Sequence, residues 1–295
     1  MNVSIVVPTV GRSTLGRLLD ALGPLPPEVE LLVVEDTERR GPAWARNTGW
    51  RSANGEWVVF LDDDVIPGPG WYRRLVRDLD VRADVGAVQG RIRVPRPAGR
   101  RPTDWERVTI GLEDGAWLTA DIAYRRPALA AAGGFDERFP RAFREDADLA
   151  YRVRRAGWRL LRGERTVTHP VRPESPWVSL RTQRGNADDA LLRRLYGPRW
   201  RALLEIPPGR RGRHALITAA AAGALGAALL PGRWKWLAAG LAFAWAAGTA
   251  EFATARIAPG PADPAEVATM AVTSVLIPPL AVGHWLAGRW KWRAA

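Results

Sequence analysis

Residues 55–64 read Gly-Glu-Trp-Val-Val-Phe-Leu-Asp-Asp-Asp, an apolar, β-branched run that ends directly in three acids. The run from Trp57 to Leu61 predicts a strand covered on both faces. Open α/β sheets bind ligands at the carboxyl ends of their strands, where Asp62, Asp63 and Asp64 stand. Adjacent carboxylates repel one another, and a hard divalent cation, Mn²⁺ or Mg²⁺, would relieve that repulsion. The alternative is a solvated acidic turn, but the position at a strand end favours a cation site.

The surrounding chain, up to about residue 170, alternates short apolar runs with amphipathic stretches. This rhythm predicts an α/β fold with a mostly parallel sheet flanked by helices. Leu15, Leu18, Leu19 and Leu22 share one face of a helix, and another helix begins near Pro42. The remaining expected strands are Val3 to Val7, Val29 to Val34, Val85 to Val88 and a run around Trp117 to Tyr124. The stretch from Pro95 to Pro102 is expected to be a mobile loop.

Composition excludes several classes of protein. The chain has 295 residues, 47% of them apolar, and no cysteine, so disulfide scaffolds, Cys-ligated metals and thiol catalysis are excluded. The net charge of +12 invites a nucleic-acid partner. All but two of the basic residues are arginine, however, and no basic run interleaved with stacking aromatics matches a known nucleic-acid-binding module, so no nucleic-acid binding is expected. The first residues lack the features of a signal peptide, which predicts a cytoplasmic first domain.

The chain changes character after residue 213. Three stretches lack Asp, Glu, Lys and Arg: Ala215–Leu230, Trp236–Ala250 and Val267–Ala287. A membrane span needs about 20 apolar residues, so the third stretch is long enough, the second is marginal and the first is short. We therefore expect hydrophobic, membrane-associated helices over 214–295. The alternative is a buried helical hairpin of a soluble domain.

Charge distribution favours one topology for this tail. Arginines precede the first stretch, Arg233 and Lys235 follow it, and Arg289 to Arg293 follow the last. If only the last two stretches cross, every basic cluster faces the cytoplasm and the loop containing Asp263 and Glu266 lies outside. Three crossings are the alternative. The chain is thus expected at the cytoplasmic membrane, with its first domain facing the cytoplasm.

Three further features point to the same edge of the sheet. Glu35 and Asp36 follow the second strand and could accept hydrogen bonds from a base or ribose. Arg46 lies early in the next helix, within reach of anionic groups. Acids at Glu145, Asp146 and Asp148 open a later helix, where acids also serve as ordinary capping residues.

Over residues 2–175 the chain resembles the family 2 glycosyltransferases, whose catalytic domain has the nucleotide-sugar-binding GT-A fold. Several elements in order carry the resemblance: Val-Ser-Ile-Val-Val-Pro-Thr, Val-Val-Glu-Asp, Ala-Arg-Asn-Thr-Gly, Phe-Leu-Asp-Asp-Asp, Gly-Gly-Phe-Asp-Glu and Arg-Glu-Asp-Ala-Asp-Leu. The resemblance implies three segments: a GT-A catalytic domain over 1–175, a basic amphipathic linker over 176–213 and the tail over 214–295.

The resemblance also implies roles for individual residues. Pro8, Thr9 and Asp36 would surround the nucleoside base, with Glu35 and Arg46 nearby. Asp62 and Asp63 would face the ribose and diphosphate of a nucleotide-sugar donor. Asp64 would ligate the metal, with His169 as an additional metal or diphosphate contact. Asp146 is similar to the catalytic base of the family, and Glu145 to its companion at the acceptor site.

The chemistry implied is an inverting, metal-dependent sugar transfer to a glycan or lipid-linked acceptor hydroxyl. The base takes the acceptor proton, and the metal, helped by Arg181 or Arg184, stabilises the leaving diphosphate. Thr37 departs from the small residue common in the family, and the Gln-x-x-Arg-Trp motif of processive synthases is absent. Two alternatives remain: a sugar-nucleotide-forming nucleotidyltransferase and a catalytically inactive GT-A membrane scaffold.

Overall fold

The computed structural model describes residues 2–294, so the limits 1 and 295 of the expected segments lie outside the described chain. Within the described residues one seven-stranded sheet has the order β2-β1-β3-β6-β5-β7-β4. Its strands are β1 Val3–Thr9, β2 Val29–Glu35, β3 Trp57–Leu61, β4 Ile66–Pro67, β5 Val85–Arg93, β6 Asp121–Arg125 and β7 Arg159–Thr168.

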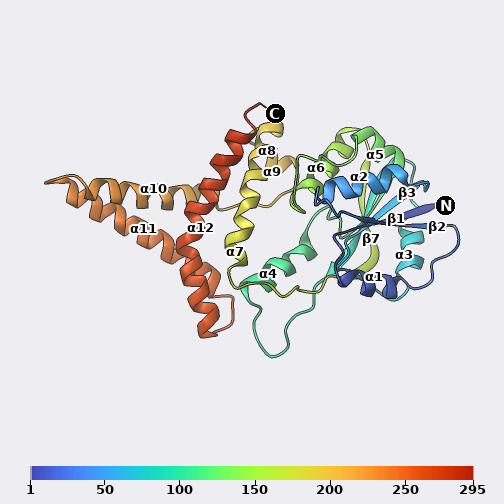
Figure 1. Cartoon of the computed structure of the whole chain (residues 1–295), viewed down its shortest axis with the longest axis horizontal. Coiled ribbons are helices and arrows are strands. Elements are labelled where there is room, and N and C mark those ends of the chain that lie inside the picture. Colours follow the sequence, from blue (N-terminus) through green and yellow to red (C-terminus); the bar gives the residue numbers. More distant parts are fainter. Residues whose placement is uncertain (1, 295) are drawn as a thin grey trace. The chain divides into compact units, whose positions relative to one another are not determined.

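Helices connect the strands and form the C-terminal part of the chain (Figure 1). They are α1 Thr14–Leu22, α2 Pro42–Ser52, α3 Trp71–Asp78, α4 Asp104–Ile110, α5 Arg126–Ala132, α6 Glu145–Arg155, α7 Val178–Arg181, α8 Asn186–Tyr196, α9 Trp200–Leu203, α10 Arg211–Ala228, α11 Trp234–Ile257 and α12 Pro264–Lys291. Two 3₁₀ turns, η1 Gly111–Asp114 and η2 Thr182–Gly185, complete the set.

The sheet is mixed rather than mostly parallel. Strand β1 pairs in parallel with β2 and β3, and β5 pairs in parallel with β7. Strand β6 runs antiparallel to both β3 and β5, and β4 runs antiparallel to β7. The expectation of a mostly parallel sheet was wrong because burial on both faces, which the apolar runs do show, results from helices on both faces and carries no information about strand direction.

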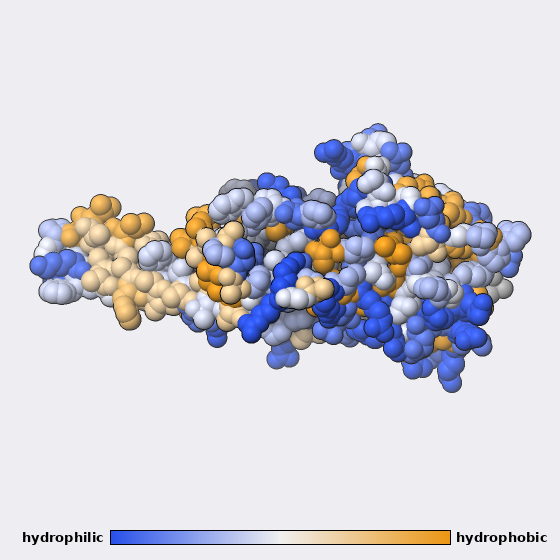
Figure 2. Space-filling view, turned by 90° about the horizontal axis from the view of Figure 1, so that it is seen from below, coloured by the Kyte–Doolittle hydropathy of each residue, from blue (hydrophilic) through white to orange (hydrophobic). Residues whose placement is uncertain are grey.

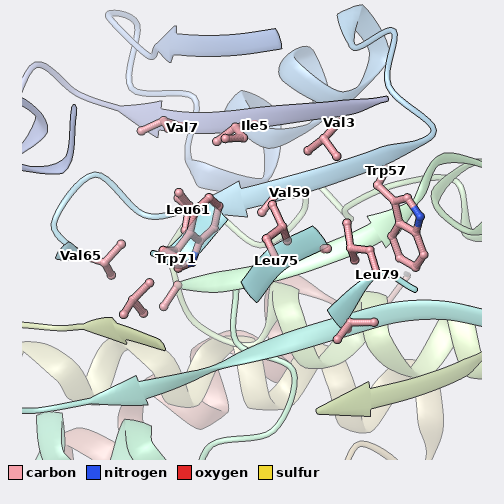
Figure 3. Close-up of a cluster of buried hydrophobic side chains, with 14 of the residues drawn as sticks. Val3, Ile5, Val7, Trp57, Val59, Leu61, Val65, Trp71, Leu75 and Leu79 are labelled. Carbon is pink, nitrogen blue, oxygen red and sulfur yellow. The ribbon is translucent and has the colours of Figure 1, made fainter. Parts of the chain in front are cut away.

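Two apolar layers enclose the sheet. On one face Val3, Ile5 and Val7 of β1 pack in one cluster with Leu75 of α3 (Figure 3). Leu18 of α1 belongs to the same cluster. On the other face the inward side chains of β3 and β6 pack with α2, α5 and α6. Figure 1 shows these two groups of helices on opposite sides of the strands. Because the sheet is sandwiched, side chains at the carboxyl ends of β1 and β3 are held on a rigid edge.

The chain divides into two compact units that are not consecutive in sequence. The first contains residues 1–95, 109–172 and 202–206, and the second contains 96–108, 173–201 and 207–295. Residues 96–108, here called the excursion, lie between β5 and η1 in sequence but belong to the second unit. The expected division into 1–175, 176–213 and 214–295 placed them in the catalytic domain. That excursion, which includes the expected mobile loop, belongs with the C-terminal helices, and α4 begins within it.

The C-terminal helices are less uniformly apolar than expected. Within the described residues α12 alone is long and apolar enough to cross a membrane, by length and composition. Helix α10 has 18 residues rich in Ala and Gly, and α11 has 24 residues that include Glu251 and Arg256. The expectation of several membrane-spanning helices is therefore reduced to one candidate, because small and charged residues lower the apolarity of the other two.

Candidate active site

Acidic side chains gather where the parallel strands β2, β1 and β3 end. Asp36 follows β2, Thr9 ends β1, and Asp62, Asp63 and Asp64 follow β3. The backbone N–H of Asp36 donates to the Thr9 carbonyl at 2.8 Å, which ties the ends of β2 and β1 together. The expected clustering at one sheet edge is thus present, and the individual contacts decide what each acid can do.

Asp63 is buried and fully engaged by its own protein. One carboxylate oxygen accepts from the Thr9 hydroxyl at 2.6 Å, and the other accepts from the Arg12 guanidinium at 2.7 Å. The backbone N–H of Gly11 donates in turn to the Thr9 hydroxyl. Asp63 therefore holds the turn after β1 in place. Its expected contact with a donor stays a prediction and would require exchange of one of these partners.

Asp62 and Glu145 share one buried guanidinium. Arg46, only 1% exposed, donates to Asp62 at 2.7 Å and to Glu145 at 2.8 Å. Asp62 follows β3 and Glu145 opens α6, so this arginine of α2 joins two acids that are 83 positions apart in sequence. The paired carboxylates raise the pKa of Arg46 despite its burial. Arg46 thus fixes the separation between the two acids that were expected on the donor and acceptor sides.

The first turn of α6 carries two acids with perturbed titration. Burial, reinforced by Asp146, raises the pKa of Glu145 to about 8 even though Arg46 opposes the shift. Its second oxygen, Oε2, is buried without a hydrogen-bond partner. Burial also raises the pKa of Asp146, whose Oδ1 accepts from the Ala147 N–H at 2.7 Å. Asp146 remains partly exposed, so it can meet a second substrate, whereas Glu145 cannot without rearrangement.

The residue before these acids has an unusual backbone. Arg144 adopts φ 80°, ψ −17°, in the left-handed region that a non-glycine residue enters only at a cost of about 1 kcal/mol or more. Its carbonyl still accepts the N–H of Asp148 at 3.0 Å. The helix therefore starts abruptly, with Glu145 and Asp146 at its positive end.

Asp64 has the surroundings of a metal ligand. Its Oδ1 lies 3.8 Å from Nε2 of His169, too far for a hydrogen bond, and its Oδ2 lies 3.1 Å from Nε of Arg172. Adjacent ligand atoms on one octahedral Mg²⁺ or Mn²⁺ stand about 3 Å apart, so Asp64 and His169 would have to approach by less than about 1 Å to share an ion. Burial, with Asp62 adding to it, raises the pKa of Asp64. A nearby divalent cation would offset that cost, so these two residues fit a metal.

The triplet 62–64 is not a three-acid cluster. Its side chains diverge, Asp62 to Arg46, Asp63 to Thr9 and Arg12, and Asp64 to His169 and Arg172. No group of three or more acidic, His or Cys side chains arranged to hold an ion occurs in residues 2–294. The expectation that one cation offsets all three charges is corrected: each acid has its own arginine partner, Arg46 for Asp62, Arg12 for Asp63 and Arg172 for Asp64. Asp64 and His169 alone would leave most of a coordination shell to phosphate oxygens and water, as Mg²⁺ sites on nucleotides often do.

The residues that are expected around the nucleoside base lie at the carboxyl ends of β1 and β2. Asp36 is 4% exposed, and its two oxygens accept the N–H groups of Arg40 at 2.8 Å and Gly41 at 2.7 Å. This shapes the turn that precedes α2. Glu35 is exposed and Pro8 half-buried, so both remain accessible. The base-binding roles of these residues remain predictions.

The side chain of Asn47 connects the Ala-Arg-Asn-Thr-Gly motif of α2 to the Gly-Gly-Phe-Asp-Glu motif, which is distant in sequence. Its side chain donates to the Phe135 carbonyl and accepts the Phe135 N–H, each at 2.9 Å. It thereby attaches α2 to the Gly-Gly-Phe turn that leads toward α6. Phe135 in turn lies beneath the guanidinium of Arg46, 5.6 Å from its ring centre.

Two further expected site residues and two unexpected ones are arginines. Arg181 and Arg184 belong to the second unit, and their expected diphosphate role remains a prediction. Arg12 and Arg172, each bonded to an acid of the triplet, were not expected as site residues. With 43 basic residues, nearly all of them arginine, no sequence pattern distinguishes these two from solvated ones.

Comparisons with known proteins found similar sequences and similar folds. Residues 29–131 match the model of the glycosyl transferase family 2. The pre-mycofactocin glycosyltransferase of Mycobacterium tuberculosis is 30% identical over 143 residues, which cover 44% of this chain and 30% of that protein. The match thus spans less than a third of the length of that relative.

One solved structure resembles nearly the whole chain. The mannosyltransferase PcManGT from Pyrobaculum calidifontis, solved in complex with GDP-Man and Mn²⁺, is 20% identical with a TM-score of 0.60. The alignment covers 98% of this chain and 87% of that one. At this identity the likeness concerns the fold. A mixed sheet between helices, with the site at the strand ends, is consistent with the GT-A fold.

Proposed function

We propose that this protein is an inverting, metal-dependent glycosyltransferase that moves a sugar from a nucleotide-sugar donor to an acceptor hydroxyl. The single observation that carries the proposal is the bridge through Arg46, which holds an acid of the strand-end triplet and an acid of α6 on one buried guanidinium. The family 2 match over 29–131 and the relative named a glycosyltransferase support it.

The donor side of the site is the strand edge. Asp62 would contact the ribose and diphosphate, and Pro8, Thr9, Glu35 and Asp36 would border the base. Asp64 and His169 would hold Mn²⁺ or Mg²⁺, which, when bound, would neutralise charge on the leaving diphosphate. The solved relative with GDP-Man and Mn²⁺ supports this assignment of donor and metal class.

The acceptor side is the start of α6. Asp146 would take the proton of the acceptor hydroxyl as its oxygen bonds to the anomeric carbon and the bond from that carbon to the diphosphate breaks. A single displacement of this kind inverts the anomeric centre. Burial raises the pKa of Asp146, so the ionised Asp146 carboxylate is a stronger base than an ordinary carboxylate. Glu145, bonded to Arg46, would position this turn of the helix.

The acceptor we propose is lipid-linked or an envelope glycan, at the cytoplasmic membrane and with the catalytic unit facing the cytoplasm. Exposed apolar side chains on the C-terminal helices, among them Leu225, Trp236 and Phe243, support this proposal. The alternative of nucleotidyl transfer depends on the Gly11-Arg12 turn as a phosphate loop, and Arg12 is instead bonded to Asp63. An inactive scaffold would have little use for a buried, half-unpartnered Glu145.

The test measures release of nucleoside diphosphate by the full-length protein with a panel of UDP- and GDP-sugars and Mn²⁺. We expect turnover with one donor, its loss on chelation, and its loss in Asp64→Asn. Asp20→Asn, an exposed acid on α1, is the matched control and should retain full activity. Equal turnover in the two variants, or turnover that survives chelation, would remove Asp64 and the metal from the mechanism.

A further inference from the structure

The connection between α11 and α12 is bonded to the excursion 96–108. Arg256, near the end of α11, donates to the Asp104 carboxylate at 2.7 Å, and Arg107 donates to the Arg256 carbonyl at 2.6 Å. Arg101 donates to the Ala258 carbonyl at 3.1 Å, and the Asp104 N–H donates to Glu266 at 2.8 Å. All of these residues belong to the second unit.

The same cluster includes α12. Arg256 is 8% exposed and also donates to Thr273 at 2.7 Å and Ser274 at 3.1 Å. A buried arginine that bonds to a carboxylate and two hydroxyls is costly to separate from them. The end of α11, the first half of α12 and Asp104 therefore form one hydrogen-bonded structure.

The covalent continuity of the chain determines on which side of a membrane the excursion and the α11–α12 connection would lie. The excursion leaves the sheet after β5 and returns before η1, so it is covalently joined to the catalytic unit at both ends. It contains Arg96, Arg100, Arg101, Asp104, Glu106 and Arg107. Each charge costs about 2.5–3.5 kcal/mol at the bilayer centre, so this segment cannot cross a membrane and return. The α11–α12 connection must lie on the same side as the sheet.

The other end of α12 is held as well. At Gly288 an added Cβ would lie 2.6 Å from the backbone of Ala187, so α12 and α8 approach closely. Earlier in the last turns, Trp285 lies beneath the guanidinium of Arg211, 3.9 Å from its ring centre. Helix α12 therefore runs along helices of its own unit, despite having the composition of a span.

The α10–α11 hairpin has a different surface. Its outward side chains include Leu216, Leu225, Leu229, Trp236 and Phe243, which are 72–86% exposed. Figure 2 shows this apolar surface along the hairpin, with hydrophilic residues at the tip, where Arg233 and Lys235 lie. At the base Glu251 pairs with Arg210 and Arg213. The apolar length, about 24 Å for 16 helical residues, approaches the roughly 30 Å of hydrocarbon in a bilayer.

We propose that the α10–α11 hairpin enters a phospholipid bilayer tip first, while α12 and the α11–α12 connection stay on the side of the catalytic unit. The basic residues at the base of the hairpin then face the head groups, and Trp234 and Trp236 near the tip suit the opposite interface. This arrangement replaces the expected crossing by the second and third stretches. It rests on the membrane association proposed above and is independent of the donor and the metal.

The test uses the absence of native cysteine, which makes any introduced thiol the sole target of a maleimide. Single variants are Ser52→Cys in the catalytic unit, Ala262→Cys in the α11–α12 connection, Pro231→Cys at the tip and Ala294→Cys near the end. Each is expressed in membranes, checked for resistance to alkaline extraction, and labelled in sealed vesicles with a membrane-impermeant maleimide.

We expect Ala262→Cys and Ala294→Cys to label whenever Ser52→Cys does, and Pro231→Cys to label from that side only after detergent. Labelling of Ala262→Cys from the side opposite Ser52→Cys would overturn the proposal. Labelling of all four from one side would also overturn it, because the hairpin would lie on the surface. Loss of the protein on alkaline extraction would remove membrane insertion itself, while the donor assay would still test sugar transfer separately.

Discussion

At the scale of single residues, charge compensation decides which acids are available for chemistry. Asp63 is held by Thr9 and Arg12, and Asp62 by Arg46, so a strong electrostatic cost is already offset without a cation. Asp64 keeps a raised pKa next to His169 and Arg172. Asp62 and Asp63 therefore position neighbouring elements, and the expected metal-binding role of Asp64 remains a prediction.

Glu145 should make the stability of the protein depend on pH. Its pKa is about 8 in the folded state and near 4.5 when unfolded, so between these values the folded protein retains a proton that the unfolded chain has released. The free energy of unfolding should therefore fall as pH rises from about 4.5 to about 8, by a few kcal/mol from this group. Glu145→Gln should flatten that slope.

Denaturant unfolding in detergent at pH 5 and pH 8 measures the effect. The comparison is between slopes, because Gln also removes an ion-pair partner from Arg46 at every pH. Wild type and Glu145→Gln should differ more in their pH dependence than wild type and Asp20→Asn. Identical slopes in all three proteins would show that Glu145 titrates normally.

Asp146 is the residue whose loss should affect the chemical step alone. Asp146→Asn keeps the size of the side chain and an oxygen that can accept the Ala147 N–H, but cannot take up a proton from an acceptor. We expect kcat to fall by about 10²-fold or more, with the thermal shift produced by the nucleotide-sugar donor unchanged. A near-normal kcat would assign the base elsewhere, and lost donor binding would indicate a structural role.

The sequence identified the acids but not their partners. Strand-end position and clustering single out Asp62 to Asp64 and Glu145-Asp146. Which carboxylate turns toward Arg46, Arg12 or His169 depends on side-chain directions set by the packed sheet and α2. Arginines are too abundant in this chain for any one of them to be recognised by spacing.

At the scale of elements, the Gly133-Gly134 turn positions α6. Both residues have positive φ, 75° and 72°, but only Gly134 is crowded: an added Cβ would lie 2.6 Å from Oδ1 of Asn47 and 2.7 Å from Nε1 of Trp50. Gly134→Ala should therefore cost backbone strain plus about 1–3 kcal/mol of overpacking. Gly133→Ala, which meets nothing within 4 Å, should cost the strain alone.

Thermal unfolding and donor turnover together test this pair. Gly134→Ala should lower both the melting temperature and kcat, because displacing Asn47 loosens the turn before Glu145 and Asp146. Gly133→Ala should lower the melting temperature less and leave kcat close to wild type. If the two variants behave alike, Asn47 does not couple the turn to the site.

Strand prediction succeeded where the sequence has a continuous apolar run and failed where it has none. The apolar runs of β1, β2 and β3 are strands as expected. Strand β7 contains Arg, Glu and Thr and has several exposed positions, so it lacks a continuous apolar run. The run expected from Trp117 begins as a strand only at Asp121, because Trp117 has φ 64° in the preceding turn.

At the scale of the whole molecule, the two units exchange a segment. Residues 95–102 were expected to be a mobile loop because they are rich in Pro, Gly and Arg. Arg101 of this loop, and Asp104 and Arg107 just after it, form hydrogen bonds with residues about 150 positions later, which composition cannot reveal. Both the segment boundaries and the membrane topology inferred from charge bias depended on treating this excursion as unattached.

Arg256 should accordingly be far more important for stability than other arginines of the helical unit. Arg256→Met removes the cation from a buried cluster and leaves Asp104 with the more distant Arg107 guanidinium, a change that costs about 3 kcal/mol or more for buried pairs. Arg210→Met breaks an ion pair whose members are one-third and one-half exposed, and should cost less than about 1 kcal/mol.

Unfolding of the full-length protein in detergent compares these variants, with Asp104→Asn and the double variant closing a cycle. The cycle should give a coupling of 1 kcal/mol or more between Asp104 and Arg256, because the pair is largely removed from water. Additive effects would mean that the excursion and the helices are stabilised independently. In that case the Asp104–Arg256 pair would not hold the α11–α12 connection, so this cycle tests one of the contacts on which the proposed membrane topology depends.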